Sequence, residues 1–307
     1  MPTLMSTLII SLALAIAAPT ARAQDPQFII GFPEDNLSND WRAAQMREIE
    51  QALSEYPRVR FLKADAQGEV SKNIFDIEDM VDQGAQLLFL GPRAPAAVTP
   101  LIERLHRQGV RIVLLTRTIN SDAYDTFISP NDAKIAGDAA AFLARHLNGQ
   151  GRVLMLEGVP TATTAIHRKD GFMTEIAKHS GITVATKTAN YSRADAIRVV
   201  EEALSENLQF DAIYAHNDAM AIGARIALKA AGIDPASKPT VSIDYLPETR
   251  EAIRNGEQLA SFTYPTCGKV GVRAALDLLN GKQVPRIINV PSQLVTRDNV
   301  EQVDTIF

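Results

Sequence analysis

Short apolar runs alternate with amphipathic segments along most of the chain. The runs are rich in Val, Ile, Leu and Phe, which is typical of strands buried in a sheet. A first series predicts strands at 28–32, 59–64, 87–91 and 111–115. A second series predicts strands at 126–129, 152–158, 183–188, 211–216, 240–244 and 259–264, and a last apolar stretch lies at 287–290.

Segments with helical periodicity separate these runs. They predict helices at 41–53, 74–84, 97–109, 132–149, 165–181, 194–206, 218–232 and 268–281. Several helices close on a glycine that fits a left-handed C-cap, namely Gly84, Gly109, Gly149, Gly181 and Gly232. Strands that alternate with helices favour parallel βαβ units, and so many strands fit two doubly wound α/β lobes better than one sheet.

The first residues predict an export signal. An apolar run at 8–18 precedes Pro19 and the small-x-small sequence at 21–23, although no Lys or Arg precedes the run. The run is shorter than the roughly 20 residues that span a bilayer. We therefore expect residues 1–23 to be a cleaved signal peptide of a periplasmic protein. No cysteine follows the run, so a lipid anchor at the cleaved end is not expected.

The amino-acid composition excludes several classes of function. The net charge is -5 without a basic block, which argues against nucleic-acid binding. The only cysteine, Cys267, cannot form an intramolecular disulfide. The sequence lacks a Walker loop, a dinucleotide-binding glycine fingerprint, a nucleophile elbow and a zinc-protease motif, so neither an enzyme nor a cofactor is indicated. His167 and His216 have no His or Cys partner at ligand spacing, and we expect no metal site.

Polar and aromatic residues follow the predicted strands directly. In parallel sheets flanked by helices, ligands bind at the carboxyl ends of the strands. The candidate ligand-binding residues are Asn39, Trp41, Arg42, Thr116, Arg117, Arg168, Tyr191, Asn217 and Asp244. Planar hydrogen-bonding groups together with aromatic rings suit a sugar or polyol. Trp41 could instead be a core aromatic and the arginines solvated charges, while Asp218 is expected to cap the helix that follows it.

In this order and spacing, several motifs resemble those of one family. They are "GF" followed by "NDWR", "LLTRTI", "AIHRKDGF", "ANYSRAD", "YAHNDAMAIGA", "SID" and "VTRDNV". The chain resembles the type I periplasmic binding proteins, in the ribose- and galactofuranose-binding branch of ABC-importer receptors.

The resemblance implies two lobes joined by a three-strand hinge. The first lobe would comprise 25–127 plus 264–289, and the second 128–263 plus 290–307. Trp41 and Tyr191 would sandwich a sugar ring, and the other candidates would hydrogen-bond its hydroxyls. The implied protein is a monomer without a cofactor, whose partners are the membrane subunits of an ABC permease or a membrane sensor.

Two positions depart from the family. Thr116 stands where an Asp is common, and Thr263 stands near the last crossover, where Gln or Glu is usual. With Asp244 as the main remaining carboxylate, Arg42, Arg117 and Arg168 would carry surplus charge, which favours an acidic ligand or one that lacks a hydroxyl. Alternatively, Glu34 or Asp40 restores the balance and a neutral sugar binds.

Four functions remain to be weighed. The favoured function is delivery of a sugar-like solute to a permease. The second is presentation of the bound solute to a chemoreceptor or sensor kinase, which requires the same cleft. A LacI-type transcription regulator would need a helix-turn-helix domain where the signal peptide stands. An exported hydrolase is disfavoured because the catalytic motifs are missing.

Overall fold

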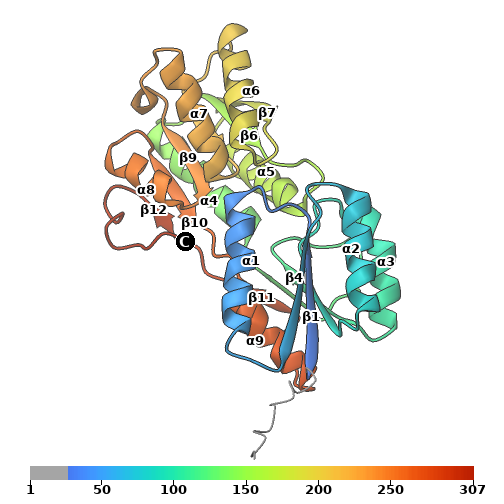
Figure 1. The fold of residues 1–307 in the computed structure, drawn as a ribbon. Coiled ribbons are helices and arrows are strands. Elements are labelled where there is room, and N and C mark those ends of the chain that lie inside the picture. The colour runs from blue at the N-terminus through green and yellow to red at the C-terminus, as the bar shows by residue number, and fades with distance from the viewer. Residues whose placement is uncertain (1–26) are drawn as a thin grey trace, which may run out of the picture.

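The computed structural model describes residues 27–307, and the predicted signal peptide lies outside them. Two sheets, each covered by helices on both faces, form the two halves of the molecule (Figure 1). The strand order is β11-β5-β4-β3-β1-β2 in the first sheet and β12-β10-β9-β8-β6-β7 in the second. The predicted fold class, two doubly wound α/β units, is confirmed.

The first sheet is parallel throughout its described pairings. Its strands are β1 (Phe28–Glu34), β2 (Val59–Asp65), β3 (Leu87–Leu90), β4 (Arg111–Leu115), β5 (Thr126–Ser129) and β11 (Ile287–Asn289). Its helices are α1 (Asp40–Leu53), α2 (Val70–Asp82), α3 (Pro95–Arg107) and α9 (Gly268–Leu279). One apolar cluster packs α1 and α9 against one face, and a second packs α2 and α3 against the other (Figure 1).

The second sheet is parallel except for its last strand, β12, which pairs antiparallel with β10. Its strands are β6 (Gln150–Glu157), β7 (Gly181–Thr188), β8 (Ala212–Ala215), β9 (Thr240–Asp244), β10 (Ala260–Thr263) and β12 (Leu294–Val295). Its helices are α4 (Asp132–His146), α5 (Thr163–Ile176), α6 (Arg193–Ser205), α7 (Asp218–Ala230), α8 (Pro247–Arg254) and the 3₁₀ turn η1 (Pro235–Ser237).

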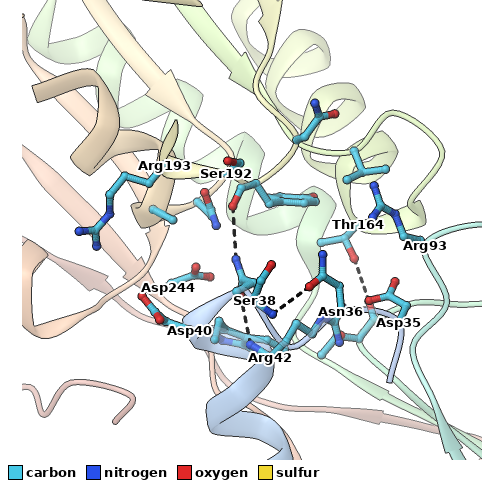
Figure 2. Close-up of a pocket in the computed structure, with 18 of the residues that line it drawn as sticks. Asp35, Asn36, Ser38, Asp40, Arg42, Arg93, Thr164, Ser192, Arg193 and Asp244 are labelled. Carbon is cyan, nitrogen blue, oxygen red and sulfur yellow. Dashed lines mark hydrogen bonds between the residues drawn. The ribbon is translucent and has the colours of Figure 1, made fainter. Parts of the chain in front are cut away.

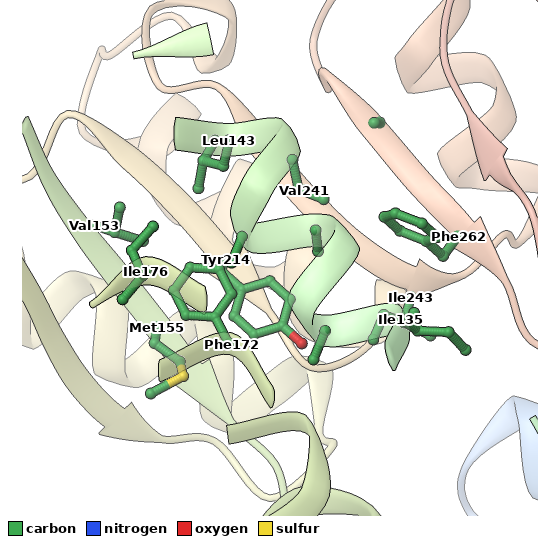
Figure 3. Packing of buried hydrophobic residues seen from close by; sticks show 14 of the residues in the cluster. Ile135, Leu143, Val153, Met155, Phe172, Ile176, Tyr214, Val241, Ile243 and Phe262 are labelled. Atoms are coloured by element: carbon green, nitrogen blue, oxygen red, sulfur yellow. The ribbon is translucent and has the colours of Figure 1, made fainter. Parts of the chain in front are cut away.

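Aromatic stacking anchors the core under α4 and α5 (Figure 3). The rings of Phe172 and Tyr214 are nearly parallel, with centroids 4.1 Å apart, and both side chains are fully buried. Such a pair stabilises the fold beyond the area that it buries, by about 0.5–1.5 kcal/mol. This core holds α5, and with it Arg168, in a fixed position relative to the sheet.

The chain passes between the halves three times, after β5, between β10 and α9, and after β11. The strand at 126–129, which chain order grouped with the second series, pairs with β4 and β11 in the first sheet. The first passage therefore follows Ser129 instead of falling near Phe127. The hydrophobic pattern did not predict α8 and β12, because both elements are short and neither has a long apolar run.

Several helices begin directly behind a strand or a passage, with a side-chain cap. Asn39, Asn131, Ser192 and Asn217 each accept a hydrogen bond from a backbone N–H of the first turn. Gly109 and Gly232 adopt the expected left-handed conformation after α3 and α7. Gly181 does not, and the expectation of a C-cap there is wrong. It lies at the start of β7, where an added Cβ would collide with the Gln150 side chain.

Candidate functional site

A cavity of about 310 Å³ lies between the halves, at the carboxyl ends of the strands (Figure 2). All the candidates predicted from the sequence line it: Asn39, Trp41, Arg42, Thr116, Arg117, Arg168, Tyr191, Asn217 and Asp244. They converge because parallel strands of one sheet end at the same edge, and the two edges face each other here. The volume is within the usual range for small-molecule sites.

The start of α1 contributes residues that also touch the second half. Asn39 caps the helix by accepting from Arg42 N (3.2 Å), and its Nδ2 donates to the backbone oxygen of Tyr191 (3.3 Å). The indole Nε1 of Trp41 donates to the carbonyl of Tyr264 (2.8 Å), and the two ring centroids are 5.6 Å apart. Trp41 therefore lines the cavity and packs in the core at the same time. The predicted sandwich of a sugar between Trp41 and Tyr191 stays a prediction.

Carboxylates accompany the arginines that line the cavity. Arg117 donates to Asp35 Oδ2 (2.8 Å) and to the carbonyl of Gly91 (3.2 Å). Arg168 donates to Asp132 Oδ1 (2.8 Å) and to the carbonyl of His216. Carboxylates outside the predicted set therefore pair with two of the three arginines, and the surplus guanidinium charge is smaller than the sequence predicted. Among the predicted arginines it is left on Arg42.

Arg42 has a weaker counterion. Its Nη1 lies 3.8 Å from Glu34 Oε2 and donates to Gln45 Oε1 at 2.9 Å. Burial raises the pKa of Glu34 to about 8 against the opposing charge of Arg42. Burial also favours the neutral form of the neighbouring Asp35. The charge of Arg117 and a hydrogen bond with the Glu34 side chain outweigh this effect and lower the pKa of Asp35. Asp35 is thus the ionised member of this adjacent pair at neutral pH.

The second half places Asn217 and Asp218 in roles that differ from those expected. Asn217 is the helix cap: its Oδ1 accepts from Met220 N at 3.0 Å while the residue lines the cavity. Asp218 is fully buried at the first helical position. It accepts from the hydroxyls of Ser242 and Ser261 and from Leu246 N (2.7 Å). Asp218 therefore joins α7 to β9, to β10 and to the backbone that follows β9, and the prediction that it caps the helix is wrong.

Asp244 presents a carboxyl group to the cavity. Within residues 27–307 this group makes no hydrogen bond or ion pair, and burial raises its pKa well above the usual range. A buried carboxyl without a partner costs free energy that a bound hydroxyl would recover. Asp244 lies at one end of the cavity and Asp35 at the other (Figure 2).

Tyr191 is wedged against the backbone of Gly158. A Cβ at position 158 would lie 2.1 Å from Cζ of the tyrosine. The guanidinium groups of Arg117 and Arg168 are 6.0 Å and 5.9 Å from the centre of the ring. Burial raises the pKa of Tyr191 to about 12, so the hydroxyl stays protonated.

Left-handed backbone is concentrated at the cavity. Thr116 has a φ of 63°, Tyr191 of 60° and Asp244 of 130°. Such conformations are costly for residues other than glycine, above all for β-branched Thr116. The Thr116 hydroxyl also donates to the carbonyl of Leu115 (2.7 Å), so its side chain is already engaged within its own turn.

Several residues at the site lie outside the set predicted from the sequence, and two of them, Asp35 and Asp132, pair with its arginines. Asp132 lies behind Arg168 at the start of α4, and Asp35 directly follows β1. Asp35 could have been found, because it stands at a strand end like the predicted candidates. Near the last crossover the cavity is lined by Tyr264 instead of Thr263, whose hydroxyl accepts from Gln293 N at 3.0 Å. The Tyr264 hydroxyl donates to Asp132 Oδ2 (3.0 Å).

Neither His216 nor the acidic residues near the cavity form a metal site in residues 27–307, where no cluster of at least three His, Cys, Asp or Glu groups has suitable geometry. His216 is buried, its Nδ1 accepts from Gly158 N at 3.2 Å, and burial keeps its pKa well below the usual range. Within the same residues, none of the helices combines the length and the apolar character that a membrane span requires.

Comparison with known proteins identifies relatives over nearly the whole described chain. The family model described as "Periplasmic binding protein domain" matches residues 30–283. A ribose import binding protein of Bacillus subtilis is 29% identical over 92% of this chain and 91% of that protein. The galactofuranose-binding protein of Escherichia coli is 28% identical over 81% of this chain and 78% of its own length.

Solved structures of periplasmic sugar-binding proteins have the same fold as this chain. The fructose-binding periplasmic domain of a hybrid two-component system matches with a TM-score of 0.85 at 30% identity, covering 89% of this chain and 92% of that one. A crystal structure of a galactofuranose binding protein matches with a TM-score of 0.85 at 25% identity, covering 90% and 96%.

Proposed function

The chain belongs to the periplasmic binding protein family, and we propose that it captures a sugar or sugar-like solute between its two lobes and delivers it to an ABC permease. The observation that carries this proposal is the cavity itself. Both halves contribute hydrogen-bonding side chains to one cavity, and the names of the relatives say that they import or bind sugars. Nothing in this role requires chemistry, only closure around a ligand.

The ligand contacts that we propose come from both lobes. Arg42, Arg117, Arg168, Asn217 and Asp244 would hydrogen-bond hydroxyls, and Trp41 and Tyr191 would lie on the C–H faces of the ring. Asn39 and Thr116 would complete the walls. Each lobe would move as a unit about the three passages described above, so that opening separates Asn39 from the backbone of Tyr191.

A second candidate role is sensory. The fructose-binding relative of known structure is a domain of a hybrid two-component system, so the same closed cleft can serve a signalling protein. In both roles we propose a monomer in the periplasm, released by cleavage after Ala23. Deleting the gene would separate them: loss of uptake of the bound sugar supports delivery, whereas intact uptake with a lost transcriptional response supports sensing.

Ligand binding is tested by a thermal-shift screen of the chain from Gln24 onward against ribose, arabinose, fructose, galactose, xylitol and myo-inositol. A ligand present at a hundred times its dissociation constant adds about 2.7 kcal/mol to the free energy of unfolding. We expect at least one compound to raise the melting temperature. It should also change the emission of Trp41, the only tryptophan, because that side chain contacts both the cavity and the carbonyl of Tyr264. A screen in which no compound has either effect contradicts the proposed function.

A further inference from the structure

The first half has one carboxylate whose position at the cavity is fixed from several sides, that of Asp35. Its backbone N–H donates to Glu34 Oε1 (3.0 Å), and its backbone oxygen accepts from Gly68 N (2.7 Å). Its Oδ2 accepts from Arg117 at 2.8 Å. The side chain is 7% exposed, so it has little room to move.

The second oxygen of this carboxylate has spare hydrogen-bonding capacity. Within residues 27–307, Asp35 Oδ1 accepts from no N–H or hydroxyl group; the carboxylate's other hydrogen bond is with the protonated side chain of Glu34, and the residue lines the cavity. An ionised carboxylate accepts hydrogen bonds and donates none, so its natural partner here is a hydroxyl or N–H of a ligand. The ion pair with Arg117 keeps the group ionised and oriented.

Position 116 cannot fill this role. The Thr116 hydroxyl donates to the carbonyl of Leu115, and the residue is held in a left-handed conformation. Among the described residues, Asp35 is therefore the carboxylate that the first half presents beside Arg117, and Asp244 is its counterpart in the second half (Figure 2).

We propose that Asp35 is a specificity-determining residue: its Oδ1 accepts a hydroxyl of a neutral polyhydroxyl ligand, and its charge discriminates against the matching sugar acid. This inference rests on the proposed sugar-binding function and deepens it. It replaces the expectation of an acidic ligand, because a ligand carboxylate near Arg117 would meet the ionised Asp35, and both Arg117 and Arg168 are already paired.

The test compares the neutral compound that binds most tightly in the screen with its own aldonic or uronic acid, by calorimetry at neutral pH. The native chain should prefer the neutral compound. Asp35→Asn should weaken its binding by about tenfold to a hundredfold, since a hydrogen bond to a charged group is lost. The same variant should lower the ratio of acid to neutral dissociation constants, a readout that a purely structural role for Asp35 would leave unchanged.

A matched control and a rescue variant complete the design. Asp82→Asn removes the same charge from an exposed position at the end of α2, outside the cavity, and should change affinity and selectivity by less than about threefold. Thr116→Asp in the Asp35→Asn background returns a carboxylate next to Arg117, at a left-handed position that Asp tolerates better than Thr. It should restore part of the preference for the neutral compound.

The outcomes separate the two hypotheses. Native binding that is undiminished and equally selective in Asp35→Asn overturns the role of Asp35 and leaves the proposed function standing. A native chain that prefers the acid also overturns the inference. If the native chain binds neither the neutral compounds nor their acids, both the proposed function and the role of Asp35 are wrong.

Melting temperatures of the unliganded variants show whether Asp35→Asn is folded. Should it unfold, Thr116→Asp alone must strengthen the preference for the neutral compound, and an unchanged ratio contradicts the inference.

Discussion

At the residue scale, the site is governed by how charge is buried. Removing one partner from a buried ion pair is costly because the other charge is left uncompensated, by about 3–5 kcal/mol. Arg168 is 2% exposed and pairs with Asp132, so replacing it with Ala should reduce stability as well as binding. Partly solvated side chains at Arg168 and Asn217 would make alanine substitutions affect binding far more than stability. Here both residues are buried and Asn217 also caps α7, so stability should fall as well.

Glu34 supplies a prediction on pH. Burial raises its pKa from 4.5 to about 8, with Arg42, Arg117 and Asp35 as the charged groups that face it. Its Oε2 has no hydrogen-bond partner within residues 27–307, so no hydrogen bond to that oxygen stabilises the ionised form. A folded-state pKa above the unfolded one gives a contribution that is complete below the unfolded value and is lost as the pH rises through the folded value.

We therefore expect the melting temperature of the native chain, relative to that of Glu34→Gln, to be highest below about pH 4.5 and to fall between about pH 4.5 and pH 8. The glutamine variant resembles the protonated acid and should lack this slope. Calorimetric scans of both proteins across the range provide the measurement. A difference in melting temperature that stays constant with pH would show that Glu34 is already ionised at neutral pH.

At the element scale, helix packing depends on where glycine allows close approach. An added Cβ on Gly171 of α5 would lie 2.2 Å from the carbonyl oxygen of Ala133 in α4. At Gly137 of α4 the nearest atom, the carbonyl oxygen of Gly171, would be 3.6 Å away, which is an ordinary contact. The two glycines lie at the same interface, but only Gly171 is required by it.

The element-scale prediction compares these glycines. Gly171→Ala should push α5 away from α4, disturb the pair between Arg168 and Asp132, and lower both the melting temperature and the ligand affinity. Gly137→Ala should be neutral or should raise the stability by up to about 0.5–1 kcal/mol, because alanine favours the helix. Thermal unfolding followed by circular dichroism tests both variants. Equal effects of the two substitutions would contradict this account of the interface.

At the scale of the whole molecule, threonines at the start of α5 and in the loop just before it join the two halves. Thr161 Oγ1 donates to the carbonyl of Arg93 (2.8 Å), and Thr163 Oγ1 accepts from Thr118 N (3.1 Å). Thr164 Oγ1 donates to the carbonyl of Thr116 at 3.1 Å. These contacts exist only while the halves are closed, so they favour closure independently of a ligand.

Replacing Thr161 and Thr163 with valine should shift the chain toward an open conformation. Neither residue lines the cavity, and each lost hydrogen bond is worth about 0.5–1.5 kcal/mol. The radius of gyration of the unliganded chain should rise in small-angle scattering, and ligand affinity should fall by about fivefold or more. Thr183→Val, on the exposed side of β7, is the control and should change neither quantity. Unchanged scattering and affinity in the double variant would exclude a role of these threonines in closure.

The amino-acid sequence by itself determined the fold class and the neighbourhood of the site. Alternating apolar runs and helical periods are local patterns, and they predict parallel strands whose carboxyl ends share an edge. For that reason residues as far apart in the chain as Asn39 and Asp244 could be expected to line one cavity, as they do.

Only the tertiary structure decided how the side chains are partnered. Asp35 reaches Arg117 and Asp132 reaches Arg168 across long stretches of chain, and no local pattern signals either pair. The cap of α7 falls on Asn217 because Asp218 is drawn into the buried hydroxyls of Ser242 and Ser261. Strand periodicity is set by neighbouring residues, whereas burial and pairing of charge depend on distant ones. The charge balance of the cavity therefore followed from the fold and not from the sequence motifs.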